Sequence, residues 1–219
     1  MTSPTHRRLA VLDTCALSDA LDRLKLSGAV AGLRRFGPRR LAVGRATTVA
    51  LARGPGTREG SHLGTSALAS SGPEHVIVVA NDGRCDGGAW GGLLTLEAHL
   101  RHVAGIVVDG ALRDVDEVDR LDVPVFARSA TPRSARGRSH ERATGVAVTA
   151  CGVHVEPGAW VVADGSGVVF FAERDAERVI AAAEEIAAAE ARMAGDLRRG
   201  EFGTQVLGPA YERLLDAGA

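Results

Sequence analysis

Arg113 and Asp114 stand side by side a few residues after the apolar run Ile106-Val107-Val108. Arginine presents a planar fork of donors that fits a carboxylate, and aspartate offers the oxygen ligand that Mg²⁺ and Mn²⁺ prefer. Such a pair could bind a metal-chelated 2-oxo acid. The alternative is a surface ion pair whose aspartate caps the helix that follows. The spacing alone favours neither interpretation.

A glycine-rich segment, CDGGAWGG over residues 85–92, runs into the helix-like stretch LLTLEAHLRHV. It lacks the G-x-G-x-x-G spacing and has no phosphate-loop lysine, so nucleotide binding is poorly supported. Gly91 and Gly92 at a helix start would leave backbone N–H groups free, and the helix dipole would favour a small carboxylate there. A tight turn with close helix packing is the alternative.

Asp109 and the arginine-rich segment 127–145 are further candidates. Asp109 directly follows the apolar run, where it could order water around a metal ion or form a plain Asp-Gly turn. The arginines of the segment alternate with small residues, so no stacking platform for single-stranded nucleic acid is predicted. We expect a solvated loop or an oligomer contact, or else recognition of a phosphorylated or polycarboxylate substrate. These arginines are Arg128, Arg133, Arg136, Arg138 and Arg142.

The surrounding sequence predicts the elements that hold these residues. HVIVVAND, GIVVDG and VPVFARS are apolar strand-like runs separated by helix-like stretches, an order typical of a βαβ core with parallel strands. We expect the first strand to end in a polar turn and GIVVDG to end at its Asp-Gly. Open α/β sheets gather ligands at the carboxyl ends of such strands. The glycine loop and the Arg-Asp pair are therefore expected at one edge of the sheet.

The rest of the chain predicts flanking elements. A helix is expected over 14–26 with Thr14 or Ser18 as its cap, and strand-like runs near 28–33 and 41–52. Two valine runs joined by Asp-Gly-Ser-Gly predict a hairpin. A long alanine-rich helix follows, with a packing stripe of less polar residues. We expect one α/β domain over 1–219, with a C-terminal helical tail from about 173 to 219. The stripe is Val179, Ala183, Ile186, Met193 and Leu197.

Composition narrows the possible partners. The chain has 219 residues, 45% of them hydrophobic, and a formal net charge of -1, which argues against a nucleic-acid-binding protein. No apolar stretch reaches the roughly 18 residues that span a bilayer, and the N-terminus lacks the apolar core of a secretion signal. Three scattered cysteines suit a reducing compartment and are expected to be buried. We expect a cytoplasmic protein without membrane or nucleic-acid partners.

Several segments are similar to those of one known family: LDTCALSDAL, AWGGLLTLEA, GIVVDGALRD and GVHVEPGAWVVADGSGVVF. The chain resembles the RraA-like family (regulator of ribonuclease activity A), which also contains the 4-hydroxy-4-methyl-2-oxoglutarate aldolases. The most specific element is Gly92, twenty residues, Arg113-Asp114, two residues, then Glu117. It looks like the family's glycine, Arg-Asp and acidic pattern at its usual spacing.

The resemblance implies a β/α sandwich that assembles into homotrimers or homohexamers with sites at subunit contacts. It also implies a divalent metal, Mg²⁺ or Mn²⁺, and action on a small 2-oxo acid. Arg113 would correspond to the arginine that grips the substrate carboxylate, and Asp114 to the metal ligand. Glu117 would be the acidic member of the catalytic set. The backbone amides of Gly91, Gly92, Leu93 and Leu94 would hold the same end of the substrate.

One departure from the family pattern bears on the reaction. The family's aldolases carry an aspartate where this chain has Gly92. Retro-aldol cleavage needs a base for the substrate hydroxyl, whereas decarboxylation needs only an electron sink at the 2-oxo group. Oxaloacetate decarboxylation is therefore expected first. An aldolase, or a related enolate enzyme of a specialised pathway, is the alternative, and a protein-binding regulator of the ribonuclease E type is another.

Overall fold

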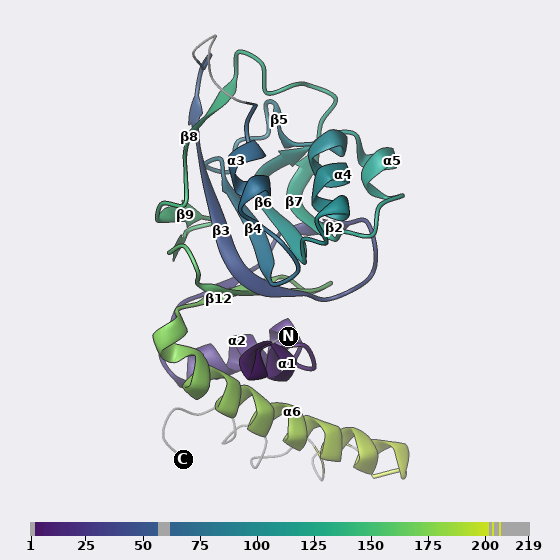
Figure 1. Cartoon of the computed structure of the whole chain (residues 1–219). Helices are drawn as coiled ribbons and strands as arrows, with labels where there is room; N and C mark the ends of the chain where they lie inside the picture. The colour runs from purple at the N-terminus through teal and green to yellow at the C-terminus, as the bar shows by residue number, and fades with distance from the viewer. Residues whose placement is uncertain (1–2, 57–61, 202, 204–205, 207–219) are drawn as a thin grey trace.

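The computed structural model describes residues 3–56, 62–201, 203 and 206 (Figure 1). The largest element is a ten-stranded sheet in the order β1-β12-β11-β3-β4-β6-β7-β2, with β5 paired to β6 and β8 paired to β3. The strands are β1 (Ala29–Val30), β2 (Arg34–Phe36), β3 (Ala42–Arg53), β4 (His75–Ala80), β5 (Gly88–Trp90), β6 (Gly105–Leu112), β7 (Val125–Ala130), β8 (Ser139–Thr144), β11 (Trp160–Ala163) and β12 (Val168–Phe171). A separate antiparallel pair consists of β9 (Val148–Ala150) and β10 (Val153–Val155).

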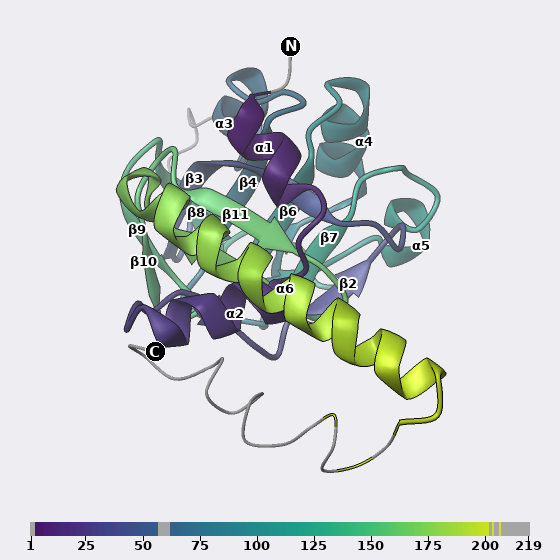
Figure 2. The same cartoon turned by 90° about the horizontal axis from the view of Figure 1, so that it is seen from below.

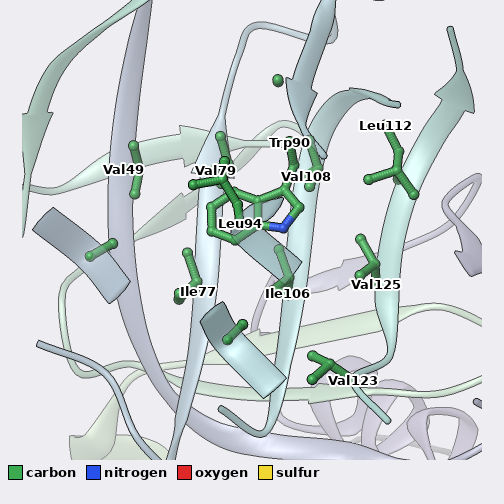
Figure 3. Packing of buried hydrophobic residues seen from close by; sticks show 14 of the residues in the cluster. Val49, Ile77, Val79, Trp90, Leu94, Ile106, Val108, Leu112, Val123 and Val125 are labelled. Carbon is green, nitrogen blue, oxygen red and sulfur yellow. The ribbon is translucent and has the colours of Figure 1, made fainter. Parts of the chain in front are cut away.

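The centre of the sheet is parallel, as predicted: β3, β4, β6 and β7 run in one direction. Successive residues of these strands enter different hydrophobic clusters. Ile77 and Val79 face the helices α3 (Thr65–Ala69) and α4 (Gly92–Leu100) (Figure 3), whereas Val76 and Val78 join the cluster on the opposite face. Because both faces are buried, these strands are continuous apolar runs rather than alternating ones.

Helices cover the sheet in two groups (Figures 1 and 2). One group lies over the parallel strands: α3 (Thr65–Ala69), α4 (Gly92–Leu100) and α5 (Val115–Val118). The other packs on β11 and β12: α1 (Pro4–Leu9), α2 (Thr14–Arg23) and α6 (Ala176–Arg198), with a short 3-10 turn before α6. Within the described ranges, no helix is both long enough and apolar enough to cross a bilayer.

Several of the expected elements are confirmed. The Asp-Gly-Ser-Gly segment joins β11 and β12 as an antiparallel hairpin, with Ala163 opposite Val168. The stripe of the long helix is buried over its first half, where Val179, Ala183 and Ile186 pack against α2 and the hairpin. The first half of the stripe therefore stabilises this chain's own core, whereas Met193 and Leu197 in its second half are only partly buried.

The predicted strand end at Asp109-Gly110 is wrong. β6 continues through both residues to Leu112, and every residue of the strand is buried. A carboxylate can remain inside the strand because Arg128 and the backbone N–H of Cys151 compensate its charge.

Three smaller predictions are also corrected. The cap of α2 is Asp13, whose side chain accepts a hydrogen bond from the Ala16 N–H, rather than Thr14 or Ser18. The arginine-rich segment is only partly a loop, because β7 extends to Ala130 and β8 pairs with β3. Cys15 and Cys85 are exposed rather than buried.

Candidate functional site

The glycine loop and the Arg-Asp pair meet at the carboxyl edge of the parallel strands, as the sequence predicts. β5 pairs with the end of β6, and the Arg113 N–H donates to the Trp90 carbonyl oxygen over 3.0 Å. Trp90 is buried (Figure 3), and its Nε1 donates to Thr95 Oγ1, which in turn donates to the Gly91 carbonyl. This Trp90-Thr95 lock fixes the start of α4 against the loop. Sequence reasoning missed it, because Trp90 precedes the expected helix and helical periodicity does not pair it with Thr95.

Asp114 has a backbone conformation that few residues other than glycine adopt, with φ 59° and ψ 43°. Its side chain makes no capping hydrogen bond to α5. Instead its carboxylate accepts from the Gly92 N–H and from Arg113 Nε, each over 3.1 Å. The capping alternative therefore does not hold for this aspartate. Left-handed backbone at a non-glycine residue costs of order 1–3 kcal/mol and is concentrated at functional sites.

Arg113 keeps most of its hydrogen-bonding capacity unused. Only its Nε is bonded to a described residue, and the outer Nη1 and Nη2 groups make no hydrogen bond there. The side chain is 39% exposed and that of Asp114 is 32% exposed. A guanidinium with a free outer edge can accept a ligand carboxylate in bidentate geometry.

Side chains of the Arg113-Asp114 pair and of Glu117 approach Gly91 and Gly92 closely. A Cβ at Gly91 would lie 2.8 Å from Asp114 Oδ2 and 2.9 Å from Arg113 Cγ. A Cβ at Gly92 would collide with Glu117 Oε2. The Glu117 carboxylate thus occupies the space into which a side chain at position 92 would project, and it makes no hydrogen bond or ion pair with the described residues.

The first turn of α4 offers donors beside this cluster. The Gly92 N–H is taken by Asp114, so it is not free as the sequence interpretation supposed. The Leu93 and Leu94 N–H groups have no acceptor among the described residues. Leu94 is buried beneath the helix, whereas the Leu93 side chain is 81% exposed. Two amides at a helix N-terminus therefore remain for an anion.

Asp109 does not join this group. It is 3% exposed, and its carboxylate accepts from Arg128 Nε over 2.5 Å and from the Cys151 N–H over 2.8 Å. Burial, reinforced by the Asp109 charge, raises the pKa of the Cys151 thiol to about 12. Asp109 is therefore hydrogen-bonded to Arg128 and Cys151 and does not belong to the group around Asp114. A role for Asp109 in ordering water around a metal stays a prediction.

The carboxylates of Asp114 and Glu117 suit a hard divalent cation that also binds water and substrate. Across the described part of the chain, no three His, Cys, Asp or Glu side chains are grouped to hold a metal ion. Asp114 and Glu117 both bring their carboxylate side chains close to Gly92. Mg²⁺ is commonly bound through one or two carboxylates, with water and substrate completing its octahedron. This donor set fits Mg²⁺ or Mn²⁺ and does not fit a fully protein-ligated structural metal.

Comparison with known proteins gives a consistent result. The family model described as RraA-like (Aldolase/RraA) matches residues 14–170. An uncharacterized protein of Methanocaldococcus jannaschii is 35% identical over 58% of this chain, which spans 60% of that relative. A putative 4-hydroxy-4-methyl-2-oxoglutarate aldolase of Deinococcus radiodurans is 32% identical over 71% of this chain and 92% of its own length.

A solved structure shares the fold. It is RraAS2 of Streptomyces coelicolor, described as an unusual member of the RNase ES inhibitor RraA protein family. The TM-score is 0.76 at 26% identity, covering 91% of this chain and 97% of the other.

Proposed function

The chain belongs to the RraA-like family, and from that membership we propose that it is a divalent-metal-dependent carbon–carbon lyase. Its substrate is a small 2-oxo acid, which reacts through a pyruvate-type enolate. The observation that carries the proposal is the position of Arg113 and Asp114 over the glycine loop, with the outer edge of the guanidinium free. Relatives named putative 4-hydroxy-4-methyl-2-oxoglutarate aldolase support a lyase of this kind.

Each group has a distinct task in this proposal. Asp114 would hold Mg²⁺ or Mn²⁺, and the bound cation would supply an electron sink at the 2-oxo group. Arg113 pairs with the substrate's C1 carboxylate and stabilises the negative charge that grows on the neighbouring oxo oxygen. The Leu93 and Leu94 N–H groups donate to the same end of the substrate.

Oxaloacetate decarboxylation demands least of this site. The C3–C4 bond breaks, its electron pair passes to the enolate of pyruvate, and the C4 carboxylate leaves as carbon dioxide. Protonation of the enolate at C3 then gives pyruvate. No base is needed, which suits a chain with glycine at position 92.

Retro-aldol cleavage is the second candidate, and the position of Glu117 favours it. Its carboxylate occupies the space that a side chain at position 92 would enter. Glu117 could therefore take the proton from a C4 hydroxyl while the C3–C4 bond breaks and its electrons form the enolate. C4 leaves as the carbonyl carbon of the second product and keeps its other two substituents.

Pyruvate release from oxaloacetate and from 4-hydroxy-4-methyl-2-oxoglutarate tests the proposal, after correction for the free-metal background. Arg113→Ala should lower the rate by about 10² to 10³ because preorganised charge is lost. Arg113→Lys should not restore it, since a point charge cannot replace a bidentate fork. Arg101→Ala, which removes a surface arginine at the C-terminal end of α4 that pairs with Glu97, is the matched control and should retain full activity. Chelation should abolish turnover, and Mg²⁺ should restore it.

Several outcomes would contradict this proposal. Full activity in verified metal-free protein would remove the metal from it. Wild-type activity in Arg113→Ala on both substrates would show that the site lies elsewhere. Faster cleavage of the hydroxy acid than of oxaloacetate would rank retro-aldol cleavage first, and no pyruvate from either would favour a regulatory binding role.

A further inference from the structure

Two ordered arginines lie beside the glycine loop without acidic partners. The Arg84 guanidinium donates to Asn81 Oδ1 over 2.6 Å, and also to the carbonyl oxygens of Asn81 and Arg138. Arg138 Nη1 donates to the carbonyl oxygens of Ser134 and Arg136. All these acceptors are neutral. Neither guanidinium forms an ion pair with any acid that the structure describes, and both side chains are only partly exposed.

A third arginine, Arg133, is held next to the catalytic strand end by its backbone. The Gly88 N–H donates to the Arg133 carbonyl over 2.9 Å, and the Thr131 N–H donates to the Leu112 carbonyl over 2.9 Å. A Cβ at Gly88 would lie 2.9 Å from Arg113 Cγ. The backbone of Arg133 is therefore hydrogen-bonded to Gly88, and the aliphatic part of the Arg113 side chain lies over that same glycine.

The neighbourhood of Arg133 leaves its charge available. Its side chain is exposed and has no ion pair or hydrogen bond within the described ranges. The acids next to Arg84 in the sequence, Asp82 and Asp86, are exposed and make no ion pair with described residues, and Asp109 is committed to Arg128. Because Arg84 and Arg138 are not neutralised, they add to the positive potential around Arg133.

We propose that Arg133, supported by Arg84 and Arg138, forms a cationic subsite that binds a second anionic group at the distal end of the substrate. This inference rests on the proposed function, because Arg113 defines the proximal end. The subsite selects 2-oxo acids with a distal carboxylate or phosphate-like group over those with a neutral end. Arg133 is here a specificity-determining residue, and the bond-breaking chemistry does not depend on it.

The subsite has a kinetic consequence in decarboxylation. In oxaloacetate the second carboxylate is the group that leaves as carbon dioxide, so its charge has moved to the enolate by the transition state. A cation on that carboxylate stabilises the bound substrate more than the transition state. Arg133→Gln should therefore raise KM for oxaloacetate and leave kcat unchanged or higher. A merely structural role would lower kcat instead.

Binding of ligands that are not cleaved tests the subsite independently of turnover. Titration calorimetry with Mg²⁺ present would compare 2-oxoglutarate with 2-oxopentanoate, which has a methyl group in place of the distal carboxylate. Wild type should bind 2-oxoglutarate about five- to tenfold more tightly, the size expected for one charge-assisted contact. Arg133→Gln should lose this preference and retain its affinity for 2-oxopentanoate. A phosphonate analogue, 2-oxo-4-phosphonobutanoate, would show whether a carboxylate or a phosphate-like group fits better.

Arg142→Gln is the matched control, because Arg142 belongs to the same arginine-rich segment but lies on β8, which pairs with β3. It should keep the wild-type preference. Equal affinity of wild type for the two acids would overturn the subsite, as would a preference that survives in Arg133→Gln, or no binding of either acid. If wild type releases no pyruvate but still prefers 2-oxoglutarate to 2-oxopentanoate, the proposed reaction is refuted and the subsite is still supported.

Discussion

Glu117 is the residue that separates the two candidate reactions. Its carboxylate faces the position where a Gly92 side chain would be, and no described residue is bonded to it. Glu117→Gln should therefore reduce retro-aldol cleavage by about 10² or more, the usual contribution of a general base. Oxaloacetate decarboxylation should fall much less, because that reaction has no hydroxyl proton to remove. Pyruvate release from the two substrates measures the difference.

Asp116→Asn provides the comparison for this experiment. Asp116 is an exposed acid in the first turn of the same short helix, α5. Its substitution should leave both rates near those of wild type. Equal losses on both substrates in Glu117→Gln would assign Glu117 to the metal and not to proton transfer.

At the scale of elements, the β11–β12 hairpin and the start of α2 are joined through one carboxylate. Asp164 accepts from Thr14 N over 2.9 Å, from Thr14 Oγ1 over 2.6 Å and from the Ser166 N–H over 2.8 Å. Burial acts to raise the pKa of Asp164, but the hydrogen bonds outweigh it and hold the pKa below its ordinary value. The resulting stabilisation is present above the ordinary carboxyl pKa. It is lost as the pH falls through the lowered pKa of the folded state.

Thr14→Val should lower the free energy of unfolding by about 1–2 kcal/mol at neutral pH, because it leaves Asp164 short of a buried donor. The difference from wild type should shrink in strongly acidic buffer, where Asp164 is protonated in both proteins. Urea unfolding across this pH range measures both effects. Thr14→Ser keeps the hydroxyl and should stay close to wild type. A pH-independent loss in Thr14→Val would assign the effect to packing.

Most helices and strands around the site could be predicted from the sequence. The parallel strands and α4 were predictable because continuous apolar runs and helical periodicity are local properties. The meeting of the glycine loop with Arg113 followed from the rule that parallel strand ends share an edge. The continuation of β6 through Asp109 was not predictable, since it depends on Arg128 and Cys151, 19 and 42 residues away. The left-handed backbone of Asp114 has only a weak local signal, because aspartate adopts this conformation more often than most residues but usually does not.

At the scale of the whole molecule, we propose that copies of the chain associate through α4. Leu93, Leu96 and Leu100 lie on one exposed face of this helix, with 81%, 41% and 69% of their surfaces exposed. The face begins at the loop that carries the site, as expected if subunit contacts border the active sites. Light scattering should give a mass three or six times 22.7 kDa, in keeping with the homotrimer or homohexamer that the family resemblance implies.

Leu100→Glu should lower that mass by placing a charge on the apolar face. Val11→Glu, at an exposed valine of the N-terminal region, should leave the mass unchanged. A monomer of wild type at micromolar concentration would refute the association. It would also undermine any site shared between subunits.

The left-handed backbone at Asp114 has a consequence for how this protein can be improved in the laboratory. Glycine adopts that conformation without strain, so a library screened only for heat resistance is expected to accumulate glycine there. The selected variants would be more stable but inactive, because they would lack the carboxylate that accepts hydrogen bonds from Gly92 and Arg113. Selection for stability therefore favours glycine at position 114, whereas selection for activity favours aspartate.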